Sequence, residues 1–72
     1  MQAMTAKELE YIADSMSNED LLIKQCAVVV STATTPALRN ICSQMIATHQ
    51  QHYDSLLHAI SHHQSLAPTQ PQ

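Results

Sequence analysis

The chain has 72 residues, a formal net charge of −3 and no glycine, phenylalanine or tryptophan. Its three permanent cations, Lys7, Lys24 and Arg39, are scattered, which argues against nucleic acid and a membrane surface as partners, because both require clustered basic residues. The longest uninterrupted apolar run, Cys26 to Val30, is far too short to span a bilayer.

A chain of this length forms one small domain that buries only about 60% of its unfolded surface. Such a domain usually needs a disulfide, a metal or a partner subunit for stability. The polar segment Met1 to Glu10 does not resemble an export signal, so we expect cytoplasmic synthesis. Two cysteines in such a protein are more often thiols than a disulfide.

The first predicted helix begins at a capping box, in which Thr5 and Glu8 satisfy free amides of the first turn. It runs to about Ala33. Ser17-Asn-Glu-Asp20 resembles a second helix start, so this helix is either continuous or kinked near Ser17. Because the apolar pattern stays in phase across Ser17, a continuous or gently kinked helix is favoured.

A connector at Thr34-Thr35-Pro36 follows, with Thr35 as N-cap and Pro36 at the first helical position. The second helix runs from Pro36 to about His63. Both helices have about 28 residues, or roughly 42 Å, and a short connector makes them an antiparallel hairpin. The domain therefore covers residues 5–63, and the proline-containing segment 64–72 is predicted to be a disordered tail.

Each predicted helix carries one row of residues at alternating steps of three and four, the spacing of a buried helical stripe. The first row consists of Leu9, Ile12, Met16, Glu19, Ile23, Cys26 and Val30. The second row consists of Leu38, Cys42, Met45, His49, His52, Leu56 and Ala59. In the hairpin, facing residues have positions that add up to about 68. Glu19 is then level with His49 and beside His52.

A carboxylate and two imidazoles in an apolar seam suggest a metal site, and these ligands suit Zn, Fe, Mn or Cu(II). The step of three between His49 and His52 matches the Glu-x-x-His element of di-metal helical bundles, with His in the Glu position. Two alternatives to a metal site stay open. In the first, Glu19 and a protonated histidine form a structural polar layer. In the second, Glu19 points to water near Ser17.

Both helices carry more apolar surface than one seam uses. The additional residues are Ala13, Leu22, Ala27, Val29, Ile41, Ile46, Leu57 and Ile60. A single hairpin cannot cover them, whereas two hairpins can. The predicted fold is therefore an all-α antiparallel hairpin that forms a homodimeric four-helix bundle.

The two cysteines, Cys26 and Cys42, fall in one layer of the hairpin. A disulfide is allowed there, but two buried thiols are the favoured interpretation. No nucleophile is paired with a base, since His49 lies roughly 10 Å along the helix from Cys42, so no enzymatic activity is expected. The pair His58 and His62 either binds metal adventitiously or complements the helix dipole, and the second is favoured.

Four segments, Met4–Asp14, Asn18–Lys24, Thr35–Arg39 and His49–Tyr53, resemble the coat F family of small spore coat proteins from spore-forming Firmicutes. The resemblance covers about residues 5–60 and implies a ferritin-like helical fold. It also implies a non-catalytic structural or assembly protein of the spore coat, or a related spore-associated protein, with itself and other coat proteins as partners. Members with the longer pattern tend to show a Glu-x-x-His-like element where this chain has His49-Gln-Gln-His52, and this departure weakens the inference of oxidase activity from the resemblance. The alternative is a ferritin-like protein that binds Zn, Fe or Mn through Glu19, His49 and His52.

Overall fold

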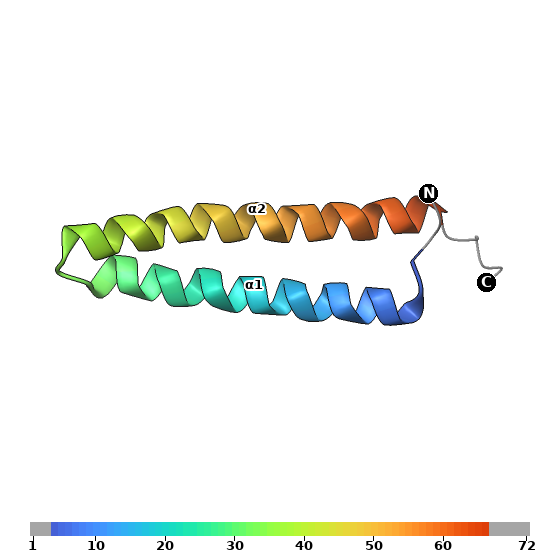
Figure 1. Cartoon of the computed structure of the whole chain (residues 1–72), viewed down its shortest axis with the longest axis horizontal. Helices are drawn as coiled ribbons and strands as arrows, with labels where there is room; N and C mark the ends of the chain where they lie inside the picture. Colours follow the sequence, from blue (N-terminus) through green and yellow to red (C-terminus); the bar gives the residue numbers. More distant parts are fainter. Residues whose placement is uncertain (1–3, 67–72) are drawn as a thin grey trace.

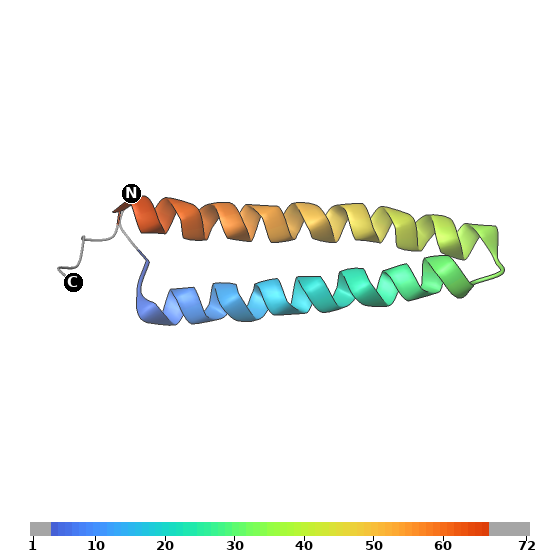
Figure 2. The same ribbon diagram turned by 180° about the vertical axis from the view of Figure 1, so that it is seen from behind.

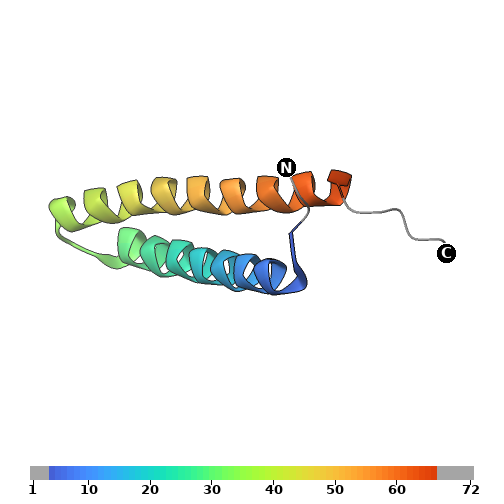
Figure 3. The same cartoon turned by 45° about the vertical axis from the view of Figure 1, so that its right-hand side comes forward.

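Two long helices lie side by side and are joined by a short turn at one end, so the opposite end of the hairpin is open (Figure 1). The computed structural model describes residues 4–66, the last two by their backbone only. Helix α1 spans Ala6–Thr32 and helix α2 spans Pro36–Leu66. The view from behind and the oblique view show the same two-helix layer, with no further element of residues 4–66 over either side (Figures 2 and 3). The all-α antiparallel hairpin is thus confirmed for the described residues.

Helix α1 begins at the predicted capping box. The Glu8 amide donates to Thr5 Oγ1 at 3.1 Å, and the Thr5 amide donates to Glu8 Oε1 at 2.9 Å. The helix is continuous through Ser17, as the unbroken apolar phase predicted. At its other end, the Ala33 amide donates to the Val29 carbonyl at 2.8 Å, which satisfies one of the last carbonyls, and the Ser31 and Thr32 hydroxyls donate to the Val28 carbonyl.

Helix α2 starts at Pro36, where a missing amide costs nothing and the fixed φ angle suits the first turn. Its first helical bond joins the Arg39 amide to the Thr35 carbonyl at 3.1 Å. The helix passes its predicted end near His63 and continues to Leu66. The first helix breaker after His63 is Pro68, so the chain has no reason to stop earlier. Residues 67–72 of the predicted tail lie outside the described residues.

The register of the hairpin follows the predicted rule. Glu19 contacts His49, and their positions add up to 68. Cys26 and Cys42, with the same sum, are near enough for their side chains to interact. Close to the open end, the Met4 amide donates to His63 Nδ1 at 2.9 Å. The helices are therefore in register from the turn to the open end.

The predicted row on α1 faces α2 along its whole length. All seven of its residues are buried or half-buried. Cys26 and Cys42, at 6% and 7% exposure, are the most protected side chains among residues 4–64. The contact between two helices therefore gives a thin core, in which aliphatic side chains are covered on one side only.

The predicted row on α2 is only half correct. Cys42, His49, Leu56 and Ala59 are buried or half-buried, but Leu38, Met45 and His52 are exposed. Their places next to α1 are taken by the half-buried Ile46, Tyr53 and Ile60.

The shift on α2 has a physical reason. Two adjacent stripes of this helix are apolar, and the hairpin can bury only one of them. The stripe with Ile46, Tyr53 and Ile60 has bulky side chains where the other has His52 and Ala59, so its burial removes more apolar area from water.

Large apolar side chains remain on the surface of both helices. They are Tyr11, Leu21, Val28, Leu38, Ile41, Met45 and Leu57, with exposures from 39% to 61%. Within residues 4–66, neither helix combines the length and the apolar character that crossing a membrane requires.

Candidate metal centre

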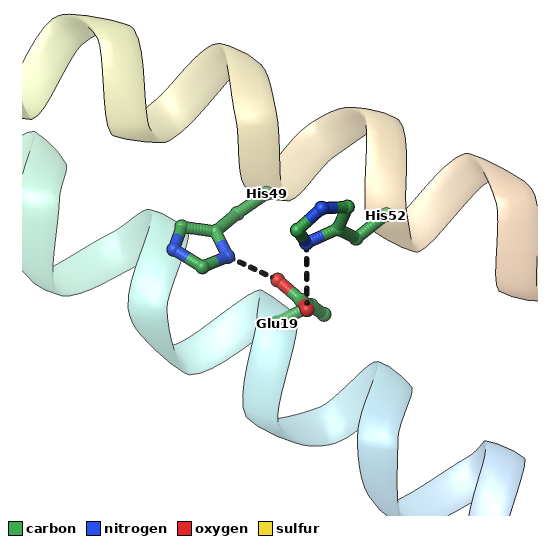
Figure 4. A group of neighbouring side chains, drawn as sticks. All are labelled: Glu19, His49 and His52. Carbon is green, nitrogen blue, oxygen red and sulfur yellow. Dashed lines mark hydrogen bonds and ion pairs between the residues drawn. The ribbon is translucent and has the colours of Figure 1, made fainter.

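The three residues predicted as metal ligands meet in the middle of the hairpin (Figure 4). Glu19 projects from α1, and His49 and His52 project toward it from consecutive turns of α2. One ligand atom from each residue can be chosen so that all three lie within 4.8 Å of one another. Among the described residues, this is the one group of three or more potential metal-binding side chains.

The Glu19 carboxylate bridges the two imidazoles. His49 Nδ1 is hydrogen-bonded to Glu19 Oε2, and His52 Nδ1 lies 3.1 Å from Glu19 Oε1. The imidazole rings meet edge to face, with centroids 5.5 Å apart and planes at 84°. Both carboxylate oxygens thus have a nitrogen partner, and this geometry excludes the alternative in which Glu19 points freely to water.

The three side chains differ in exposure. Those of Glu19 and His49 are 17% and 18% exposed, whereas that of His52 is 54% exposed. Partial desolvation of Glu19 raises the pKa of its carboxyl group, but the hydrogen bonds from His49 and His52 outweigh it and hold the pKa below its ordinary value. Glu19 is therefore a carboxylate at neutral pH, as a metal ligand must be.

The same atoms suit either a hydrogen-bonded layer or a metal ion. In the observed geometry, imidazole N–H groups donate to the carboxylate, and in a metal complex the ion replaces these protons. A tetrahedral ion with bonds of about 2.0–2.2 Å would hold its ligand atoms roughly 3.3–3.6 Å apart, and the three candidate atoms lie within 4.8 Å of one another. Three protein ligands would leave at least one position of a tetrahedral ion for water or a further ligand.

The cysteines do not belong to this centre. Cys26 and Cys42 are free thiols in a separate layer, one full heptad from Glu19 and His49. Burial raises the pKa of the Cys26 thiol, and the neighbouring Cys42 raises it further. A thiol held in its protonated form is a poor nucleophile and a poor metal ligand. The predicted interpretation as two buried thiols is confirmed.

The structure also gives His63 a role that the sequence analysis did not assign. Its Nδ1 accepts a hydrogen bond from the Met4 amide, so this ring links α2 to the segment just before α1 at the open end. The positions of Met4 and His63 add up to 67, close to the sum of about 68 for facing residues, so the register could have predicted this contact. His58 and His62 lie on exposed turns of α2, outside the three-residue centre.

An open hollow lies on the other side of the helix contact from His52. It is lined by Asp20, Ile23, Gln50, Tyr53 and Asp54. Asp20 is engaged in an ion pair with Lys24 at 2.8 Å, one turn along α1. Two carboxylates, Asp20 and Asp54, therefore line this hollow beside the apolar Ile23 and the ring of Tyr53.

No family model, no curated protein and no solved structure matches this chain. The resemblance to the coat F family therefore stays a prediction.

Proposed function

We propose that this protein is a non-catalytic structural element that assembles with itself into a four-helix bundle. The observation that carries the proposal is the imbalance of its surface. Seven large apolar side chains are at least 39% exposed, while within residues 4–64 only the two cysteines are buried. Burial of apolar area is the main favourable term in folding, so a second layer of helices would supply stability that the single hairpin lacks.

The resemblance to the coat F family supports a setting for this assembly. It favours the spore coat, or a related spore-associated structure, with a ferritin-like arrangement of the paired hairpins. The scattered basic residues are in keeping with a role as a building block.

Sedimentation equilibrium at micromolar concentration tests the assembly. We expect a dimer, with a melting temperature that rises with protein concentration, because association stabilises the folded chain by mass action. A compact, cooperatively folded monomer at the same concentration contradicts the proposal. Immunogold labelling of sporulating cells of the source organism then tests the location.

A second function, binding of a transition-metal ion, is favoured by the geometry of Glu19, His49 and His52. A carboxylate between two imidazoles offers one oxygen and two nitrogen ligands, which Zn²⁺ and Fe²⁺ accept readily. Elemental analysis of the untagged protein is the test, and we expect a transition metal bound in a fixed ratio to chain. Loss of that metal in His49→Ala, but not in His58→Ala, assigns it to this centre.

Oxygen consumption with added Fe(II) separates a binding protein from an oxidase. We expect no acceleration over buffer, because each hairpin contributes a single carboxylate to the centre. Rapid catalysed oxygen uptake contradicts the non-catalytic role.

A further inference from the structure

The row on α2 that the hairpin leaves outside its seam has a regular pattern. Leu38, Met45 and His52 follow one another at intervals of seven, so they form one stripe along the helix. They are 45%, 39% and 54% exposed. This stripe therefore contains both apolar surface and the most exposed ligand of the metal centre.

Helix α1 extends this surface with two aliphatic residues. Leu22 lies four residues before Cys26, and Val29 lies three residues after it. Leu38 and Met45 have the same two offsets from Cys42 on α2. In two right-handed helices that run in opposite directions, equal offsets from a facing pair lie on the same side. We call the side that bears Leu22, Val29, Leu38 and Met45 the apolar side. Asp20 and Asp54, which line the hollow, belong to the opposite side.

The centre occupies the midpoint of the hairpin. Glu19 is the middle residue of the 27-residue helix α1, and the middle of the 31-residue helix α2 falls between His49 and His52. When two identical hairpins overlap over their full length, their midpoints are level. The two copies of the centre then lie at the same height in the bundle, whichever way the second hairpin runs.

From this placement, we propose that a second copy of the chain docks on the apolar side and that the two copies share the metal centre. The inference rests on both proposed functions and couples them. His52 lies on the apolar side and is 54% exposed, so a partner docked there would meet the exposed edge of the three-residue centre. The partner supplies the equivalent carboxylate and imidazoles, so ligands that one hairpin lacks come from the other.

The available area is sufficient for this contact. The hairpin measures 55 by 19 Å along its two longest directions. Such a side projects about 1,000 Å², above the ~800 Å² per partner of a standard stable interface. A second copy is also a suitable partner, because a two-fold contact places the apolar side of one chain against the same apolar side of the other.

Linkage between metal binding and dimerisation tests the proposal. If the centre is shared, Zn²⁺ tightens the dimer, and dimerisation tightens Zn²⁺ binding by the same factor. We expect Zn²⁺ to lower the dimer dissociation constant of the full chain at least tenfold in sedimentation equilibrium. Met45→Glu places a charge on the apolar side without removing a ligand. It should give a monomer that binds Zn²⁺ at least tenfold more weakly in calorimetric titration.

Two further variants complete the design. Leu38→Glu changes the same side at a position eleven residues from His49, so its effect cannot pass through a neighbouring turn. Leu57→Glu is the matched control, since Leu57 is 47% exposed and lies outside the apolar side. Helix content from circular dichroism shows that each variant is folded, and Leu57→Glu should behave as wild type.

The outcomes are distinct. A dimer constant that is independent of Zn²⁺, together with equal Zn²⁺ affinity in wild type and both apolar-side variants, overturns the shared centre but leaves metal binding intact. A wild-type chain that binds no Zn²⁺ refutes the metal function and the shared centre together. Zn²⁺-linked dimerisation that survives Met45→Glu and Leu38→Glu but is lost in Leu57→Glu assigns the contact to another side and overturns the proposal.

Discussion

Thermal unfolding with and without Zn²⁺ is the most direct measurement on the metal centre. Zinc at one hundred times its dissociation constant stabilises the folded state by about 2.7 kcal/mol. A domain of this size gains about 4–8 °C per kcal/mol, so the melting temperature should rise by roughly 10–20 °C. Protein concentration is kept constant, because association also changes the melting temperature. Excess chelator should reverse the rise completely.

Removal of one ligand should reduce the rise in melting temperature that zinc produces. His49→Ala leaves Glu19 and His52 as the remaining ligands. If the affinity falls about a hundredfold, the same zinc concentration contributes only about 0.4 kcal/mol, or roughly 2–3 °C. His58→Ala, an exposed imidazole elsewhere on α2, is the control and should keep the full shift. Equal shifts in wild type, His49→Ala and His58→Ala would show that zinc does not bind at this centre.

Further predictions concern stability and reactivity. Thr5→Ala removes the capping box and should cost about 1 kcal/mol in chemical denaturation, whereas the exposed Thr34→Ala should be neutral. Because the folded state lowers the Glu19 pKa, the carboxylate adds stability above about pH 4.5 that disappears as the pH falls through the lower folded pKa. Metal-free Glu19→Gln should therefore lose stability less steeply on acidification than wild type, and equal slopes contradict this. The buried thiols, with the Cys26 pKa raised, should react slowly with a thiol reagent at pH 7.5 and rapidly in denaturant.

Much of this fold could be predicted from the sequence because the signals that specify it are local. Thr5 and Glu8 mark a helix start through a side-chain and backbone pattern only four residues long. Pro36 marks the second start in the same way. Once the turn is placed, the register follows from equal helix rise. The facing of Glu19 and His49 is therefore a consequence of counting residues outward from the turn.

The rotation of α2 about its own axis could not be predicted with the same certainty. Its apolar surface is wide, and the periodic pattern accommodates both the stripe with Met45 and the stripe with Ile46. The choice depends on which side chains pack better against α1, which is a property of two helices together and not of one segment. His52 belongs to the stripe that stays outside, so its 54% exposure follows from this rotation.

The same rotation of α2 places His52 on the side of the hairpin that also bears Leu38 and Met45. Had the stripe of Met45 and His52 packed into the hairpin, the ligands would have been enclosed by one chain, with no side open to a partner. In the observed arrangement Glu19 and His49 are held in the seam, and His52 reaches the centre from the apolar side. A second layer of helices that covers Leu38 and Met45 would therefore also approach the exposed edge of the proposed metal centre. The proposed dimer contact and the proposed shared centre thus involve the same surface.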